Sequence, residues 1–191
     1  MVEKLTVRPT EIQGVFVAET TPFADHRGAF ARFFCADELA PVLGERSIVQ
    51  INHSRTREVG AVRGMHFQRP PHAEMKLVRC VRGRVFDVAL DLRADSPTFL
   101  RWHAEPLDPT TARMLVVPEG CAHGFQVLEE ESEILYMVTE FYSPESEEGV
   151  HPEDPMISIQ WPLPVRELSR KDACQRFLTP SYTGLVHYKG D

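Results

Sequence analysis

VFDVALDL, residues 85–92, is the stretch that indicates most clearly how this 191-residue chain folds. Large apolar residues occupy every second position from Phe86 to Leu92, with Asp87, Ala89 and Asp91 between them. Successive side chains of a β-strand point to opposite faces, so a repeat of two predicts a strand. We expect this strand to have one apolar face and one more polar face.

Similar short segments lie on both sides of this strand. KLVRCV precedes it at residues 76–81, and the joining Arg82-Gly83-Arg84 is typical of a hairpin turn. Four further segments have strand-like patterns: SIVQINH (47–53), RMLVVP (113–118), HGFQVL (123–128) and EILYMVTEFY (133–142). The best helix candidate, Ala36–Leu43, is short and is interrupted by Pro41.

Turn-forming residues divide the rest of the chain into short pieces. Many short strands separated by such turns predict an all-β sandwich or barrel. We expect residues 1–191 to form a single domain, because the length suits one and no linker or internal repeat interrupts it. Residues 180–191 are expected to be a loosely held tail.

Composition excludes several classes of protein. The sequence is 42% hydrophobic and 26% charged, which is enough apolar material for a packed core. No apolar stretch approaches the roughly 18–20 residues of a membrane-spanning helix, and MVEKLTVRPTEI at the start lacks the apolar segment of a signal peptide. Four well-separated cysteines are typical of free thiols in a reducing compartment. We therefore expect a cytoplasmic protein with no membrane partner.

The charges are unevenly distributed along the chain. A net charge of −7 argues against a nucleic-acid partner, which needs a basic surface. Nevertheless, Arg55–Arg84 contains eight Lys or Arg and two acids, whereas Glu129–Asp154 contains ten acids and no Lys or Arg. A basic segment in an acidic protein suits a small anionic ligand, although an ordinary surface with salt bridges has the same composition.

One segment raises the question of a metal. VPEGCAHGF, residues 117–125, contains Pro118-x-Gly120-x-x-His123, which resembles the second motif of cupin barrels, where the histidine often binds a metal. Lys76 stands where such barrels supply a carboxylate ligand, and its charge would repel a divalent ion. His66-x-Gln68 replaces the usual His-x-His. A metal-binding His123 and a hydrogen-bonded core His123 both remain open.

Six segments together resemble one enzyme family. They are RGMHFQ (63–68), KLVRC (76–80), DVALDLRADSPTF (87–99), VPEGCAHGF (117–125), ILYMVTEFYSPESE (134–147) and LSRKD (168–172). Their order and spacing are similar to those of the dTDP-4-dehydrorhamnose 3,5-epimerase family, and the similarity extends from Gly14 to Asp172. The resemblance implies a homodimeric cupin-type jelly-roll barrel with short peripheral helices, a nucleoside-diphosphate sugar substrate, and neither a metal nor a redox cofactor.

The implied reaction needs three kinds of group. A ketone at C4 of a 6-deoxyhexose makes the hydrogens on C3 and C5 weakly acidic, so epimerisation needs a base, an acid on the opposite face, and positive charge near the enolate oxygen. The resemblance implies that His66 is the base, that Asp172 hydrogen-bonds it, that Tyr136 is the acid and that Lys76 stabilises the enolate. A capping Asp172 and a core Tyr136 would fit the local sequence equally well.

The same resemblance implies a set of substrate-binding residues: Arg27, Arg32, Gln50, Asn52, Arg63, His123, Glu147 and Lys171. Planar arginines suit a diphosphate, although each would otherwise be interpreted as a surface residue. The chain departs from the family pattern at Arg32, Leu100, Cys121 and Pro152. These departures leave open the nucleotide and the hexose. Inversion at C3 alone or at C3 and C5 depends on how the sugar and Tyr136 are aligned, which the residue identities do not reveal.

Three other functions stay open. A sugar-nucleotide 3,4-ketoisomerase would use histidines around the same ligand but would not need Tyr136 opposite His66. A metal-dependent cupin enzyme would contain stoichiometric metal, and a non-catalytic sugar-binding barrel would release no substrate hydrogen. We also expect a homodimer in which an N-terminal strand crosses between subunits and brings Arg27 into the neighbour's site.

Overall fold

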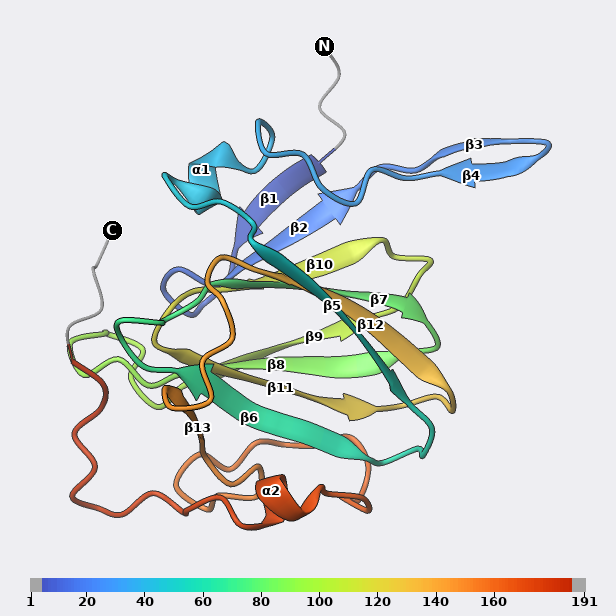
Figure 1. Ribbon diagram of the computed structural model, residues 1–191. Helices are drawn as coiled ribbons and strands as arrows, with labels where there is room; N and C mark the ends of the chain where they lie inside the picture. The colour runs from blue at the N-terminus through green and yellow to red at the C-terminus, as the bar shows by residue number, and fades with distance from the viewer. Residues whose placement is uncertain (1–4, 187–191) are drawn as a thin grey trace.

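The computed structural model describes residues 5–186, which form two facing antiparallel sheets (Figure 1). One sheet has the order β1 (Leu5–Pro9), β2 (Phe16–Thr20), β10 (Arg113–Val117), β7 (Lys76–Arg82), β12 (Ser132–Val138) and β5 (Gln50–Thr56). The other has the order β13 (Glu147–Gly149), β6 (Val62–Gln68), β11 (Cys121–Val127), β8 (Val85–Asp91) and β9 (Trp102–Leu107). This jelly-roll arrangement confirms the all-β prediction.

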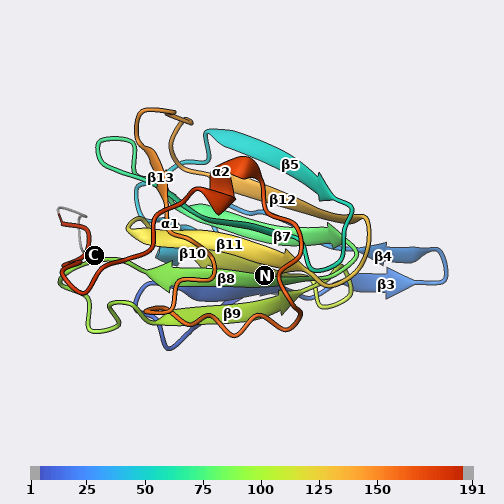
Figure 2. The same ribbon diagram turned by 90° about the horizontal axis from the view of Figure 1, so that it is seen from below.

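The remaining elements are small. Within residues 5–186, β3 (Phe23–Asp25) and β4 (Gly28–Phe30) pair only with each other, and Figure 1 shows their hairpin extending away from the two sheets. Helix α1 (Ala40–Leu43) lies over the six-stranded sheet, and helix α2 (Arg170–Ala173) lies beside the five-stranded sheet. Figure 2, seen from below, shows α2 in front of the strands and close to β13.

Apolar side chains form three layers. The middle layer lies between the sheets and includes Val78, Leu115 and Ile134. A second cluster joins α1 to the outer face of the six-stranded sheet through Leu43 and Leu77, among others. The third cluster packs residues 150–185 against the outer face of the five-stranded sheet. Successive side chains of a strand point to opposite faces, so each strand that contributes to an outer cluster also points side chains towards the other sheet.

The strand predicted at residues 85–92 is present as β8, and the structure shows where its two faces point. The apolar face, including Val88 and Leu90, packs outwards in the third cluster. The more polar face points into the barrel, where Asp87 and Asp91 are fully buried. A buried carboxylate requires hydrogen-bond partners, so this face indicates a polar interior.

The predicted hairpin at Arg82-Gly83-Arg84 is wrong. The turn is present, with Gly83 at a φ of +71°, but β7 and β8 belong to different sheets and do not pair. Ser132 holds the turn, because its hydroxyl accepts from the N–H of Arg84 and lies within hydrogen-bond distance of the Arg84 carbonyl oxygen. A tight glycine turn thus carries the chain across the core from one sheet to the other.

Several element boundaries differ from the predictions. The strand predicted from Ser47 begins at Gln50, and the strand predicted to Tyr142 ends at Val138. Pro41 does not interrupt the helix predicted in this region. It lies in the first turn of α1, where backbone N–H groups have no partner within the helix. A proline there removes no helical hydrogen bond.

The C-terminal segment makes specific contacts as far as it is described. The N–H of Leu185 donates to the carbonyl of Leu92 at 2.7 Å, and the ring of Tyr182 stacks on Phe99 with centroids 5.9 Å apart. The rest of the tail predicted at residues 180–191 lies outside the described residues. Across residues 5–186, no helix is long and apolar enough to cross a membrane.

Candidate active site

A cavity of about 520 Å³ lies inside the barrel between the two sheets. Ten of the twelve predicted site residues line it: Gln50, Asn52, Arg63, His66, Lys76, His123, Tyr136, Glu147, Lys171 and Asp172. They come from six strands and from α2, segments far apart in the sequence. The inward faces of both sheets therefore converge on one polar site.

A β-bulge in β6 places Arg63 and His66 in the same cavity. In a regular strand, residues three apart point to opposite faces. Here His66 pairs with His123 of β11, whereas Arg63 pairs with Phe125, so three steps along β6 match two steps along β11. The extra residue restores a common direction for the two side chains.

His66 is hydrogen-bonded to Asp172 across 106 positions of sequence. Its Nε2 lies 2.5 Å from Oδ1 of Asp172. The Asp172 side chain is 4% exposed and that of His66 is 27% exposed, so the carboxylate is covered while the ring still reaches the cavity. The carboxylate accepts from Nε2–H, which leaves the lone pair of the neutral ring on Nδ1.

Helix α2 fixes the position of Asp172. Ser169 caps the helix, and its hydroxyl accepts from the N–H of Asp172 at 3.0 Å. Burial raises the pKa of Asp172, but the hydrogen bond and charge of His66, together with Ser169 and the N–H of Gly64, outweigh burial and leave the pKa below its ordinary value. The carboxylate is thus kept ionised beside the imidazole.

Tyr136 reaches the cavity from the sheet opposite His66. It lies on β12 and pairs with Asn52 of β5 and Val78 of β7, whereas His66 lies on β6 of the other sheet. Its ring packs in the middle layer beside Ile134, on the predicted side of the strand. Burial and then the negative charge of Glu74 raise the pKa of Tyr136, so the side chain is a neutral phenol over a wide pH range.

Lys76 provides a positive charge in the cavity. Its Nζ lies 3.2 Å from Oε1 of Glu74 and donates to the backbone carbonyl of His66 at 3.5 Å. The side chains of Lys76 and Glu74 are 11% and 9% exposed. Burial raises the pKa of Glu74, an effect that the Lys76 ammonium opposes.

His123 has a carboxylate partner of its own. Its Nε2 lies 2.8 Å from Oδ1 of Asp87, which is fully buried on β8. Burial raises the pKa of Asp87, opposed by the charges of His123 and Lys76. The interpretation of His123 as a hydrogen-bonded histidine is thus in agreement with its surroundings, and its ring also lines the cavity.

The other predicted residues surround the mouth and walls of the cavity. Lys171 Nζ lies 2.5 Å from Glu147 Oε2, and the Tyr142 hydroxyl donates to the same oxygen at 2.6 Å. On β5, Gln50 Nε2 donates to Asn52 Oδ1 at 2.9 Å. Arg63 Nε donates to the hydroxyl of Thr56 at 2.8 Å, and no carboxylate is within ion-pair distance of its guanidinium among the described residues.

Comparison with known proteins identifies the family. The family model for dTDP-4-dehydrorhamnose 3,5-epimerase matches residues 9–179. The chain belongs to this family. The dTDP-4-dehydrorhamnose 3,5-epimerase of Shigella flexneri is 42% identical over 180 residues, which cover 93% of this chain and 99% of that protein. The dTDP-4-dehydrorhamnose 3-epimerase of Streptomyces niveus is 38% identical over 169 residues, 88% of this chain and 81% of the relative.

A solved structure extends the similarity to the fold. The dTDP-6-deoxy-D-glucose-3,5-epimerase of Legionella pneumophila, crystallised with dTDP-4-keto-L-rhamnose, aligns with a TM-score of 0.86 at 38% identity, over 91% of this chain and 92% of that one. The protein is therefore an epimerase of the isomerase class with a cupin-like jelly-roll fold. The family resemblance predicted from the six segments is confirmed.

Two predicted residues lie outside the cavity of this epimerase. Arg27 is at the tip of the β3–β4 hairpin, with its side chain 78% exposed and paired with Asp25 at 2.7 Å. Arg32 pairs with Glu38 at 3.0 Å. Within one chain, neither residue reaches the site that the other ten line.

The other departures from the family pattern are also absent from the cavity lining. Cys121 is buried in the middle layer, and the carbonyl of Pro152 accepts from the indole N–H of Trp161 at 2.8 Å. Leu100 has a φ of +60°, a left-handed conformation that explains why a glycine is common at this position in the family. None of these side chains replaces a group in the epimerase site.

The predicted set omits several polar groups at the site, among them Glu74, Asp87 and Tyr142. Asp87 gave a usable signal, because an acid at an inward position of a buried strand needs a partner. Glu74 stands two residues before Lys76, which places both on one face of an extended chain. Tyr142 follows the end of β12, where no strand period predicts its direction.

The histidines of the epimerase do not form a metal-binding cluster in the part of the chain that is described. Residues 5–186 contain no group of three or more His, Cys, Asp or Glu placed to hold an ion. His66 and His123 are neighbours in register, but each is bonded to its own carboxylate, Asp172 or Asp87.

Proposed function

We propose that this epimerase acts on a dTDP-linked 4-keto-6-deoxyhexose and inverts C3, or C3 and C5, through an enolate. The observation that carries the proposal is the placement of His66 and Tyr136 on opposite sheets around one cavity. A base and an acid on opposite walls are what inversion at carbon needs, since the proton must return to the other face. A 3,4-ketoisomerase does not require this arrangement.

His66 begins the reaction as the base. Nε2 is held by Asp172, so Nδ1 is free to take the hydrogen of C3. The electron pair of the C–H bond then moves onto the C4 oxygen as an enolate, and the imidazolium is stabilised by the Asp172 carboxylate. Asp172 acts through His66 and is a positioning residue.

Lys76 and Tyr136 complete the inversion. The Lys76 ammonium stabilises the negative charge on the C4 oxygen, and this effect is large in a cavity shielded from water. The Tyr136 phenol then gives its proton to C3 from the opposite side. His66 then releases its proton to solvent and the Tyr136 phenolate takes one up from solvent, which restores both groups before any second cycle at C5.

The diphosphate and nucleotide would lie near the basic part of the cavity. The Arg63 guanidinium has no carboxylate partner among the described residues, and its planar fork suits two phosphate oxygens. The Legionella relative was crystallised with a dTDP-sugar, and the relatives from Shigella and Streptomyces are named for dTDP-sugars. These names support thymidine as the nucleoside of the sugar-nucleotide substrate.

A labelling experiment tests this function. The enzyme is incubated with dTDP-4-keto-6-deoxyglucose in D₂O, with the UDP- and CDP-linked sugars in parallel, and NMR locates the deuterium. We expect exchange at C3, or at C3 and C5, fastest with the dTDP-sugar. Binding of the sugar nucleotide without any exchange would instead identify a non-catalytic binding protein.

We infer that the enzyme works as a homodimer. Among the described residues the β3–β4 hairpin pairs with no other strand, and Phe23 and Phe30 on it are 72% and 63% exposed. A two-stranded hairpin with uncovered aromatic residues is marginal in water. Covering by a second copy would remove this exposure and would bring Arg27 to the neighbour's cavity.

A cytoplasmic location suits this reaction. The four cysteines of the chain, Cys35, Cys80, Cys121 and Cys174, are all free thiols. Free thiols are usual in a reducing compartment. We infer that the enzyme acts there on a soluble sugar nucleotide, as a step of deoxysugar biosynthesis.

A further inference from the structure

Glu74 is a carboxylate inside the reaction cavity that the proposed mechanism does not use. Glu74 and Lys76 are two residues apart, so an extended backbone points both side chains the same way. Met75 between them is buried on the other side, in the cluster beneath α1. The N–H of Met75 donates to the Thr139 hydroxyl at 2.9 Å, and the N–H of Thr139 donates to the Met75 carbonyl at 3.2 Å. This segment is therefore fixed beside the end of β12.

The Glu74 carboxylate has one strong contact. Its Oε1 lies 3.2 Å from Lys76 Nζ, whose other polar neighbour is the carbonyl of His66. Both charged side chains are almost covered. Burying a charge is costly unless an opposite charge lies beside it, and Glu74 provides that opposite charge for the Lys76 ammonium. Glu74 thus holds the cation of the site, and Lys76 Nζ also donates to the backbone of the strand that carries His66.

The same carboxylate acts on Tyr136. Besides the effect of Glu74 on Tyr136, the charges of four other side chains affect the pKa of Tyr136 or of Glu74. They are Lys76, Arg63, Glu147 and His123. Burial is the largest cause of the raised pKa of Tyr136, and the charge of Glu74 is the next, with Glu147 adding to it and Arg63 opposing it. Glu74 is therefore the acid with the largest effect on this tyrosine.

We propose that Glu74 is a positioning residue for the epimerisation: its carboxylate holds the Lys76 ammonium and sets the charge that Tyr136 faces. The proposal rests on the proposed function, because it assigns Lys76 to the enolate oxygen and Tyr136 to proton return. Glu74 touches neither the reacting carbon nor the C4 oxygen. Its effect reaches the substrate through these two side chains.

The first test uses the pH dependence of turnover. Glu74→Gln keeps the shape of the side chain and removes the charge, so the Tyr136 proton is lost more easily. We expect the alkaline limb of kcat to move to lower pH by on the order of one unit.

We expect kcat of Glu74→Gln to fall on the order of tenfold, less than the roughly 10²–10⁴-fold contribution of a positioned acid or base. KM should change less, since the diphosphate contacts are retained. Glu74→Asp, which keeps a carboxylate, should restore most of the wild-type profile.

The second test does not depend on turnover. The ultraviolet absorbance of phenolate is titrated in wild-type enzyme and in Glu74→Gln, and the same titrations in Tyr136→Phe backgrounds are subtracted to isolate Tyr136. The Tyr136 midpoint should fall in Glu74→Gln. Glu129→Gln is the matched control, because it removes the same charge from a side chain that is 55% exposed on the surface. Glu74→Ala gives the same expectation if the glutamine variant fails to fold.

The outcomes separate the two proposals. An unchanged Tyr136 midpoint and an unchanged alkaline limb in Glu74→Gln would overturn the role of Glu74. If wild-type enzyme shows no deuterium exchange, the proposed function fails, while the absorbance titration still decides whether Glu74 sets the charge around Tyr136.

Discussion

His66 presents one ring nitrogen to the cavity and the other to a covered carboxylate. That arrangement determines the tautomer of the base without any contact from the substrate. His123 repeats the pairing with Asp87, and the two histidines are neighbours in register across β6 and β11. At the scale of single residues, both histidines of the site are therefore oriented by carboxylates of the protein itself.

Replacing His66 tests the base. His66→Ala should lower kcat by about 10²–10⁴-fold, the usual contribution of a positioned base, and should leave far-UV circular dichroism unchanged. The measurement is turnover of the dTDP-sugar together with C3 deuterium exchange. Turnover at the wild-type rate would refute the assignment.

Replacing Tyr136 tests the acid separately. Tyr136→Phe removes the proton donor but leaves His66, so the C3 hydrogen can still be removed and returned on the same side. We expect inversion to decline more than deuterium wash-in at C3, as followed by NMR in D₂O. An equal loss of both would mean that His66 and Tyr136 do not have separate roles.

Asp172 makes stability depend on pH. Its pKa is lowered in the folded protein, so its ionised form contributes stability above the unfolded pKa of about 3.9. That contribution is lost as pH falls through the folded pKa. In urea titrations, the difference in unfolding free energy between wild type and Asp172→Asn should shrink below about pH 4. A difference that is constant from pH 7 to pH 2 would contradict this.

The sequence predicts which side chains line the cavity better than it predicts their hydrogen-bond partners. Ten of the twelve predicted side chains line it, because the family resemblance supplies motifs at fixed positions. It does not supply Glu74, which belongs to no quoted motif. Asp87 lies in a quoted motif, but its partner His123 is 36 residues away, and only the fold brings the two together. The roles of these residues stay predictions.

At the scale of elements, β6 is the strand on which the site depends. Its bulge turns Arg63 and His66 to the same side, which a period of two does not predict. Gly64 lies between them with a φ of +135°, and a Cβ there would lie 2.9 Å from the carbonyl oxygen of His123. Only glycine fits both the backbone angle and the close approach of β11.

Gly64→Ala should therefore damage both stability and activity. We expect a loss of about 1–3 kcal/mol from the backbone conformation alone, with a further loss from the contact with β11. Gly28→Ala is a matched control for stability, because Gly28 has a φ of +140° but no neighbour within 4 Å of the added atom. Urea unfolding of the two variants measures the difference. Equal losses would show that the contact with β11 is unimportant.

The sequence predicts strands more reliably than their pairing. Alternation identified β7 and β8 as strands, but the glycine turn between them does not specify which sheet follows. The choice is made by contacts far along the chain, such as Ser132 holding Arg84. Pro41 was equally ambiguous, since a proline starts a helix as readily as it interrupts one.

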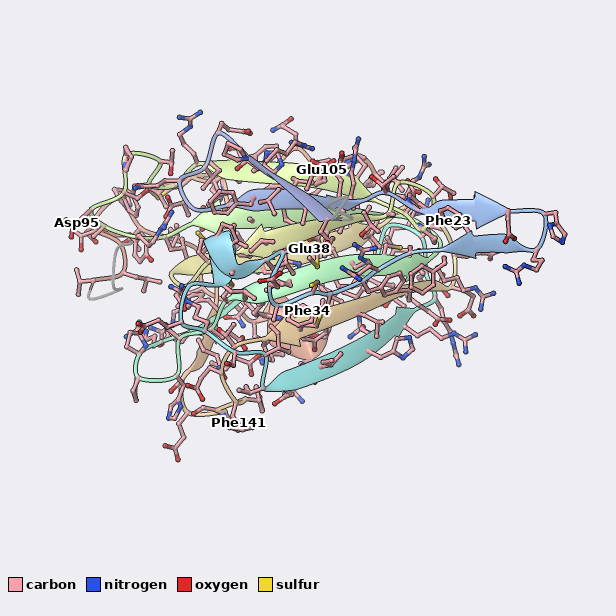
Figure 3. The ribbon with its side chains drawn as sticks, turned by 90° about the horizontal axis from the view of Figure 1, so that it is seen from above. Phe23, Phe34, Glu38, Asp95, Glu105 and Phe141 are labelled. Carbon is pink, nitrogen blue, oxygen red and sulfur yellow. The ribbon has the colours of Figure 1, made fainter. Side chains whose placement is uncertain are left out.

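At the scale of the whole molecule, the β3–β4 hairpin is the element whose aromatic side chains a single chain leaves exposed. Figure 3 shows Phe23 at the base of the hairpin, on the opposite side of the molecule from Phe141. The two sheets and three apolar clusters are complete without the hairpin. A single domain over residues 1–191 stays a prediction, as does the second subunit.

Light scattering tests the assembly. We expect the mass of a dimer at micromolar concentration and a shift towards monomer in Phe23→Ser/Phe30→Ser, because these side chains would be covered by the partner. Phe141→Ser is the control, since Phe141 is 62% exposed but lies away from the hairpin. A wild-type monomer would contradict the homodimer, and an equal shift in both variants would place the interface elsewhere.

The position of α2 near the end of the chain has a consequence for biosynthesis. The strands that carry His66 and Tyr136 leave the ribosome well before Asp172, so the barrel can close while its imidazole still lacks a counter-ion. A nascent or C-terminally clipped chain would hold an assembled pocket with an untethered histidine. The bond between His66 and Asp172 would then form only when this single helical turn docks beside β6.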